Sequence, residues 1–363
     1  MSAETGVATL RRYLGREIYK AAAFVLIAFL GLFAFFDLIG ELRDVGRAGY
    51  RLGQAFVFVA LSLPGHVYEL FPIAALIGTL YVLAHLAANS EFTVMRTSGL
   101  SPLQAGAVLV RIGLVFVAVI IAVGELVTPF AERAAQQLRL LSLNNAVGTQ
   151  FRSGIWVRSN GSYVNIARVR GDTTLLDVRL YQFDAESRLV SISDAREGHY
   201  AGNGIWMLSG VVETRFDEHG ATVNRMDEQP WTSVLTPEVL NVLAVDPQKM
   251  SAWDLFQYAR HLNANKQNAT RYEIALWQKV TYPAAALVMM ALALPFGYLN
   301  VRHGGVGLKV FSGIMLGVVF HGLNSLFSNL GLLENWPPAV SAWVPSAVFL
   351  LAALAMMWWV ERR

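Results

Sequence analysis

Residues 176–192 read LDVRLYQFDAESRLVSI, with apolar and polar side chains alternating on both sides of an Asp-Ala-Glu turn. This alternation predicts antiparallel β-strands that have one packed face and one solvated face. Similar segments recur from Ile155 onward, separated by turn-forming Asn, Asp and Gly clusters. Their regular spacing is typical of a sandwich, a barrel or a jelly roll. The expected strands are Ile155–Arg158, Tyr163–Arg168, Leu176–Phe183, Leu189–Ile192, Ile205–Val212 and Ala221–Met226.

This strand-rich region lies between two groups of long apolar segments. A helix that crosses a bilayer needs about 20 apolar residues, and six segments meet that requirement. The chain is 55% hydrophobic and only 15% charged, whereas a soluble domain is about a quarter charged. We therefore expect an α-helical membrane protein with six transmembrane helices and an inserted all-β domain. The six segments are Ala21–Ile39, Tyr68–Ala88, Leu103–Phe130, Ile274–Leu299, Val306–Leu330 and Val340–Val360.

The expected domain boundaries follow from this arrangement. Residues 1–131 hold the first three transmembrane helices, residues 132–271 the β-domain and its linker, and residues 272–363 the last three helices. A helix capped by Ser251 is expected to run to about His261. The apolar stretch Gln54–Leu63 is short and is followed by Pro64, so we expect a break there. The stretch would then be an interfacial piece that leads into the second span, and not a separate crossing.

Basic residues in the short loops predict the orientation, because cytoplasmic loops are enriched in Lys and Arg. Six crossings place both termini on one side, and that side carries the larger number of basic residues. We therefore expect cytoplasmic termini and an exported, periplasmic β-domain. The terminus side holds Arg11, Arg12, Arg16, Lys20, Arg96, Arg111, Arg302, Lys309, Arg362 and Arg363, and the opposite short loops hold Arg43, Arg47 and Arg51.

The sequence offers no catalytic or metal-binding set. Cysteine is absent, which excludes disulfides, thiolate metal sites and a cysteine nucleophile. Neither an HExxH zinc motif, a GxSxG nucleophile elbow nor a GxxxxGK[ST] phosphate loop occurs. A net charge of +3 is too small to indicate nucleic-acid binding. We expect no enzyme activity and no cofactor in this chain, so any ATP hydrolysis belongs to another subunit.

Residues 89–99, between the second and third spans, read NSEFTVMRTSG. Ser90 can cap a short helix, Glu91 suits its positive end, and Gly99 ends it. Phe92, Met95 and Arg96 would then share one side. A short helix joined rigidly to two spans suits a groove on a partner protein. The alternative is an interfacial helix that lies on the membrane.

From this segment outward, the chain resembles the lipopolysaccharide export permease family (LptF/LptG), most of all its G-type members. The resemblance covers nearly the whole chain and rests on the order and spacing of several motifs, including the three final spans. The motifs are Phe71-Pro72-Ile73-Ala74-Ala75-Leu76, Glu91 through Gly99, Gly154-Ile155-Trp156-Val157 and Leu243-Ala244-Val245-Asp246-Pro247.

The resemblance implies the membrane subunit of an ABC transporter in the bacterial inner membrane. Its partners would be a second, F-type permease, a cytoplasmic ATPase dimer that uses ATP and Mg²⁺, and a single-span periplasmic bridge protein. The β-domain would be a jelly roll that continues into this bridge. The 89–99 helix would be the coupling helix, with Glu91 contacting the ATPase groove beside Phe92, Met95 and Arg96.

The implied substrate is lipopolysaccharide, whose phosphates require cations at the outer membrane face. Arg43 and Arg47 follow the first span, and Arg133 and Arg139 follow the third. Arg43 and Arg139 also match positions where the family has basic, substrate-contacting residues. The alternative is that all four arginines merely anchor helix ends near lipid headgroups.

The chain departs from the family pattern at Asp37 and Asp44, where G-type members often carry lysine. These carboxylates would repel phosphate, so we expect Arg43 or Arg47 to neutralise them, or the lipid to be held elsewhere. Two other functions stay open. One is a mechanotransmission permease that moves its exported domain without translocating lipid. The other is a membrane-anchored scaffold or enzyme whose β-domain does the work.

Overall fold

The computed structural model describes residues 3–47, 49–97, 99, 101–143, 154–159, 162–169, 174–184, 188–217, 220–233, 246–264, 267–298, 305–334 and 336–362. Within these residues, six helical stretches are long and apolar enough to cross a membrane. A six-stranded antiparallel sheet is inserted between the third and the fourth. The predicted fold class, six spans with an inserted β-domain, is confirmed.

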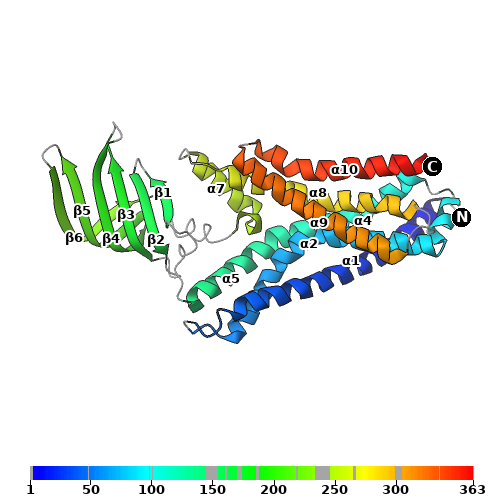
Figure 1. The fold of residues 1–363 in the computed structure, drawn as a ribbon, viewed down its shortest axis with the longest axis horizontal. Coiled ribbons are helices and arrows are strands. Elements are labelled where there is room, and N and C mark those ends of the chain that lie inside the picture. Colours follow the sequence, from blue (N-terminus) through cyan, green and yellow to red (C-terminus); the bar gives the residue numbers. More distant parts are fainter. Residues whose placement is uncertain are drawn as a thin grey trace.

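The helices form a bundle with the sheet beyond one end and both chain termini at the other (Figure 1). We call the two ends of the bundle the sheet end and the terminus end. The helices are α1 (Ala3–Leu42), α2 (Leu52–Ala88), α3 (Glu91–Thr97), α4 (Pro102–Ala122), the π-helical turn η1 (Val123–Val127), α5 (Thr128–Leu143), the 3₁₀ turn η2 (Pro247–Lys249), α7 (Ala252–Ala264), α8 (Thr270–Tyr298), α9 (Val306–Leu333) and α10 (Pro338–Glu361).

Helix α2 runs unbroken through Pro64 and Pro72, so the predicted break before the second span is wrong. Proline removes one backbone hydrogen bond, but a transmembrane helix tolerates it where neighbouring groups compensate. Two neighbours hold α2 at this point. The Lys249 side chain packs over Gly65, and His66 Nε2 lies 2.6 Å from Asp37 Oδ2 on α1.

Helix α2 also lies at the centre of the bundle. In an apolar stretch of 18 residues within this helix, 83% of the residues are buried. In an apolar stretch of the same length in α1, only 6% of the residues are buried. Helix α1 nonetheless approaches α2 very closely at one point. A Cβ added to Gly78 would lie 2.6 Å from the backbone nitrogen of Ala22. Glycine is therefore required at this crossing, as is common where transmembrane helices pack tightly.

The six strands pair in sequence order, as in an antiparallel meander. Asn203 and Gly204 both have positive φ in the β4–β5 hairpin, which is the geometry of a tight type I′ turn. Trp206, Leu208 and Val211 are buried on the packed face. Among the described strands, no pairing beyond sequence neighbours closes the sheet into a jelly roll. The strands are β1 (Ile155–Ser159), β2 (Ser162–Val169), β3 (Leu175–Phe183), β4 (Leu189–Gly202), β5 (Ile205–Asp217) and β6 (Gly220–Thr232).

Candidate functional site

Arg139 of α5 lies at the sheet end against the loop that joins α1 to α2. Its guanidinium donates to Asp44 at 3.0 Å, lies 3.4 Å from Glu41, and stands 5.3 Å above the Phe58 ring. The buried Tyr50 hydroxyl donates to the same Glu41 at 2.9 Å. Burial raises the pKa of Tyr50 most, and this hydrogen bond raises it further. The phenol therefore remains a neutral donor. Arg139 therefore ties α5 to the α1–α2 loop.

The other three predicted phosphate-contacting arginines differ in their surroundings. Arg133 pairs with Asp254 of α7, and Arg47 pairs with Asp44 at 2.9 Å while its side chain stays 72% exposed. Arg43 is exposed and forms no ion pair among the described residues. Asp44 is thus neutralised by Arg47 and Arg139 together.

Asp37 pairs with His66 of α2, to which the sequence assigned no functional role. His66 Nε2 lies 2.6 Å from its Oδ2, and His66 Nδ1 lies 3.9 Å from Glu69. Phe33 packs against the same imidazole, with ring centroids 5.1 Å apart. The two aspartates that depart from the family pattern are therefore both paired within the chain.

Removing Arg139 is expected to cost more stability than removing Arg43. Arg139→Met leaves the nearly buried Glu41 with Tyr50 as its remaining partner, and an uncompensated polar group in such a place costs about 1–3 kcal/mol. Arg43→Met removes an exposed cation that has no carboxylate partner among the residues that the structure describes. Thermal unfolding in detergent should show a lower Tm for Arg139→Met alone. Equal Tm values for the two variants would contradict the anchoring role.

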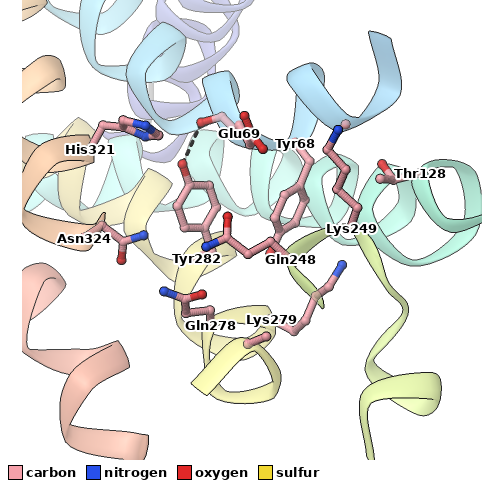
Figure 2. A pocket seen from close by; sticks show the side chains of 12 residues that line it. Tyr68, Glu69, Thr128, Gln248, Lys249, Gln278, Lys279, Tyr282, His321 and Asn324 are labelled. Atoms are coloured by element: carbon pink, nitrogen blue, oxygen red, sulfur yellow. Dashed lines mark hydrogen bonds between the residues drawn. The ribbon is translucent and has the colours of Figure 1, made fainter. Parts of the chain in front are cut away.

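A polar junction lies near the sheet end, where α2, α5, α8 and α9 meet η2 (Figure 2). It surrounds a small cavity of about 40 Å³, enough for one or a few waters. Figure 2 shows the Tyr282 hydroxyl donating to the main-chain oxygen of Glu69, at 2.6 Å. Lys249 pairs with Glu132 at 3.3 Å, and Gln278 donates to Ser328 at 2.6 Å.

Lys279 of α8 is the most enclosed cation of this junction, with its side chain only 3% exposed. Its ammonium lies 3.6 Å from Glu125, donates to the Gly124 carbonyl at 3.1 Å, and stands 4.7 Å above the Tyr68 ring. Glu125 also accepts from the backbone N–H of Ala252, the first residue of α7, at 2.8 Å. The Glu125 carboxylate thus connects two spans to the segment that returns from the sheet.

The π-helical turn η1 contains both Gly124 and Glu125. A π-turn inserts a residue into an α-helical run, and such turns are frequent at functional sites. A Cβ at Gly124 would lie 2.5 Å from Tyr68, so α2 and η1 touch along a glycine surface. The sequence analysis singled out neither Glu125 nor Lys279. The available signal was a lone lysine inside an apolar span, which is costly and by default functional.

A double-mutant cycle should show strong coupling between Lys279 and Glu125. Lys279→Met leaves the partly exposed Glu125 without its cation, and leaving a polar group without its partner costs about 1–3 kcal/mol. Glu125→Gln in the same chain removes the uncompensated charge and should restore part of the lost Tm. Additive losses in the double variant, measured by thermal unfolding, would show that the two groups are not coupled.

The short helix predicted at residues 89–99 forms as α3, at the terminus end. Phe92 is buried against Tyr298 of α8, with perpendicular rings 4.9 Å apart, and Met95 packs against the same core. Glu91 accepts a hydrogen bond from the Tyr13 hydroxyl at 3.2 Å, and Val94 is exposed. The Arg96 side chain lies outside the described part of the chain. Phe92 and Met95 thus fix α3 to the bundle, and its exposed side includes Val94.

The start of α3 differs in detail from the prediction. Ser90 has a φ of 61° and contributes its carbonyl, which accepts from the Val94 N–H, whereas no side-chain cap from Ser90 is seen among the described contacts. Gly99, with a φ of 97°, ends the segment as predicted. Ser251 caps α7 as predicted, accepting from the Asp254 N–H at 3.1 Å.

The family model of the lipopolysaccharide export system permease LptF/LptG matches residues 12–359. The chain belongs to the LptF/LptG family. The LptG proteins of Haemophilus influenzae and Escherichia coli K12 are 30% and 31% identical to it, covering 98% and 96% of this chain and 98% and 97% of their own lengths. The LptF protein of Escherichia coli K12 is 23% identical over 96% of this chain and 94% of its own length.

Membership in the LptF/LptG family confirms the predicted resemblance and its leaning towards the G-type members. The chain is a multi-pass membrane protein of permease type, and its relatives are named as permease proteins of the lipopolysaccharide export system. No group of three or more His, Asp or Glu side chains within the described residues is placed to hold a metal ion.

Proposed function

We propose that this chain is the G-type membrane subunit of an ABC transporter that extracts lipopolysaccharide from the bacterial inner membrane. The observation that carries the proposal is the match of the permease family model to residues 12–359. The F-type relative at 23% identity supports a heterodimer in which this chain pairs with an F-type permease. ATP and Mg²⁺ are used by a separate, cytoplasmic ATPase dimer, and lipid leaves through a single-span periplasmic bridge protein.

In this proposal both termini are cytoplasmic and the sheet is periplasmic. The terminus end carries the larger share of the short-loop Lys and Arg, as cytoplasmic loops do. The domain limits stay those expected from the sequence, with a membrane part at 1–131, the periplasmic jelly-roll-like domain at 132–271 and a second membrane part at 272–363. Helix α5 continues the third span to Leu143 and so leads towards the sheet.

Helix α3 acts as the coupling helix in this account. Glu91 and the exposed side of α3 contact the ATPase groove, and Arg96 adds a cation to that contact. Phe92 and Met95 transmit the resulting movement, because their side chains pack into the core that α2 and α8 form. A rigid, packed connection is what a force-transmitting element requires.

Lipopolysaccharide phosphates meet the arginines of the sheet end. Arg43 and Arg47 make the first contacts, since both are exposed. Arg133 and Arg139 contribute by exchanging carboxylate partners for phosphate as the spans move, which couples substrate binding to the α5 anchor. The acyl chains lie along α1, whose apolar side chains Phe24, Ile27 and Phe35 are exposed on the isolated chain.

The internal pairing of Arg133 and Arg139 also favours a second function. If these pairs persist throughout the cycle, the chain transmits force to its periplasmic domain and the F-type partner alone carries the lipid. The two functions differ in one respect that can be measured. Only the first requires lipopolysaccharide to touch this chain at the sheet end.

The proposed function is tested by reconstitution. Proteoliposomes that contain this chain, the F-type permease, the ATPase and lipopolysaccharide should transfer lipid to the soluble domain of the bridge protein when ATP is added. Vesicles that lack this chain, or hold its Glu91→Lys variant, should transfer at the level seen without ATP. Equal transfer with and without this chain would contradict the proposal.

A further inference from the structure

A basic hollow lies between α1 and α4, near the terminus end of the bundle. Its volume is about 1070 Å³, and it opens to the surroundings of the bundle. Three of its cations, Arg12, Arg16 and Lys20, repeat every four residues and so lie on one side of α1. The fourth, Arg111, comes from α4. Below the cations, the wall is formed by Tyr19, Ile112, Leu114 and Val115.

The hollow carries an excess of positive charge. Lys20 pairs with Glu17 at 2.8 Å, whereas Arg12, Arg16 and Arg111 form no ion pair among the described residues. Glu17 is the one carboxylate in this group of described side chains, and His85 lies near it. Arg16 also interacts electrostatically with Glu17, so the four cations share one carboxylate among the described side chains. The excess positive charge is available to an anion from outside the chain.

The two helices hold this arrangement firmly. The Tyr19 hydroxyl donates to the Ile112 carbonyl at 3.1 Å, and the Tyr19 ring packs edge-on against Phe116, with centroids 5.2 Å apart. A Cβ added to Gly15 would lie in ordinary contact with Ile112, 3.7 Å away. The cations and the apolar wall are thus parts of one preformed surface.

Position and chemistry together specify the occupant. Arg111 directly precedes the apolar run 112–124 of the third span, so it lies where that span begins, near the terminus end. Leu114, one turn deeper, is 54% exposed. Cations at the headgroup level above an apolar wall fit a phosphate with acyl chains attached, and basic pockets between spans on the cytoplasmic side bind anionic lipids.

We propose that the α1–α4 hollow binds an anionic phospholipid of the cytoplasmic leaflet. Arg12, Arg16 and Arg111 contact its phosphate, and Leu114 and Val115 contact an acyl chain. This lipid is distinct from the transported substrate, which meets the opposite end of the bundle. The inference rests on the proposed function only for the orientation of the chain in the membrane.

Because the chain contains no cysteine, Leu114→Cys gives a single labelling site. The variant is labelled with a fluorophore, assembled with its F-type and ATPase partners, and placed in nanodiscs with brominated phosphatidylglycerol or brominated phosphatidylcholine at equal mole fraction. Bromine quenches fluorophores in contact with it. We expect apparent affinity for the anionic lipid to exceed that for the zwitterionic lipid by about fivefold or more.

Charge-matched variants separate the hollow from general membrane attraction. Arg12→Gln, Arg16→Gln and Arg111→Gln together should abolish the preference, while Arg43→Gln, Arg47→Gln and Arg51→Gln together, at the other end, should preserve it. Added inorganic phosphate should not displace the lipid.

Equal quenching by both lipids in the unmodified hollow would overturn the proposal. Lipid-independent protection of Leu114→Cys that appears only with the F-type partner would assign the hollow to a protein contact instead. Transport activity is measured separately, so loss of lipid preference does not bear on the proposed function.

Discussion

Gly78→Ala is expected to be among the most destabilising single substitutions in the membrane part of this chain. The new Cβ would lie 2.6 Å from the nitrogen and 2.7 Å from the Cα of Ala22. The nitrogen and the Cα of Ala22 belong to the α1 backbone, so they cannot rotate away from the new Cβ as a side chain could. Overpacking a core usually costs about 1–3 kcal/mol, and a backbone clash belongs at or above the upper end of that range.

The matched control is Gly31→Ala in α1, where an added Cβ meets nothing within 4 Å. The control should leave the thermal unfolding of the purified chain unchanged or raise its Tm slightly, since alanine favours helix more than glycine by about 1 kcal/mol. Gly78→Ala should lower both the Tm and the amount of protein in the membrane. Equal Tm values for the two variants would show that α1 does not approach α2 as described.

Phe92→Ala is expected to uncouple ATP hydrolysis from transport. The Phe92 side chain is 2% exposed and contacts Tyr298 and Gly297 of α8. Truncating a buried phenylalanine costs about 3–5 kcal/mol, which is large for a helix of seven residues. If α3 is the coupling helix, as proposed, the variant still meets the ATPase, but the movement of α3 no longer reaches α8.

The measurement compares ATP hydrolysis and lipopolysaccharide transfer in the same proteoliposomes. Phe92→Ala should keep most of the hydrolysis and lose transfer by about tenfold or more, as expected when a contact worth over 1.4 kcal/mol is removed. Phe92→Leu keeps an apolar side chain in place and should restore most of the transfer. Normal transfer by Phe92→Ala would contradict the anchoring role, and so would equal loss in both variants.

The sequence predicted the architecture because the deciding signals are local. Length and hydropathy identify six spans, and two-residue alternation identifies six strands, so each segment carries its own evidence. The predicted break at Pro64 was wrong, and the contacts made at this point are not local in sequence. Next to Pro64, α2 contacts Lys249 and Asp37, which come from other parts of the chain and leave no signal in the local sequence.

The sequence predicted several residues of the candidate sites, but it did not predict which residues pair with each other in the folded chain. Arg139 and Asp44 are 95 residues apart, and nothing in the local sequence of either one indicates the other. The same holds for Lys279 and Glu125, which come from α8 and from the π-helical turn η1. For α3, the three-residue spacing correctly placed Phe92 and Met95 together, but periodicity alone does not say whether that side meets the bundle or a partner.

The measurement that tests the central claim most directly is photocrosslinking to lipopolysaccharide in cells. A photoreactive amino acid replaces Arg43, with Phe33 of α1 as a second position and Leu114, near the terminus end, as the control. We predict adducts with lipopolysaccharide at Arg43 and Phe33 that depend on an active ATPase, and none at Leu114. Adducts on the F-type partner with none at Arg43 or Phe33 would contradict a lipid path along this chain, and would make it a transmitter of force.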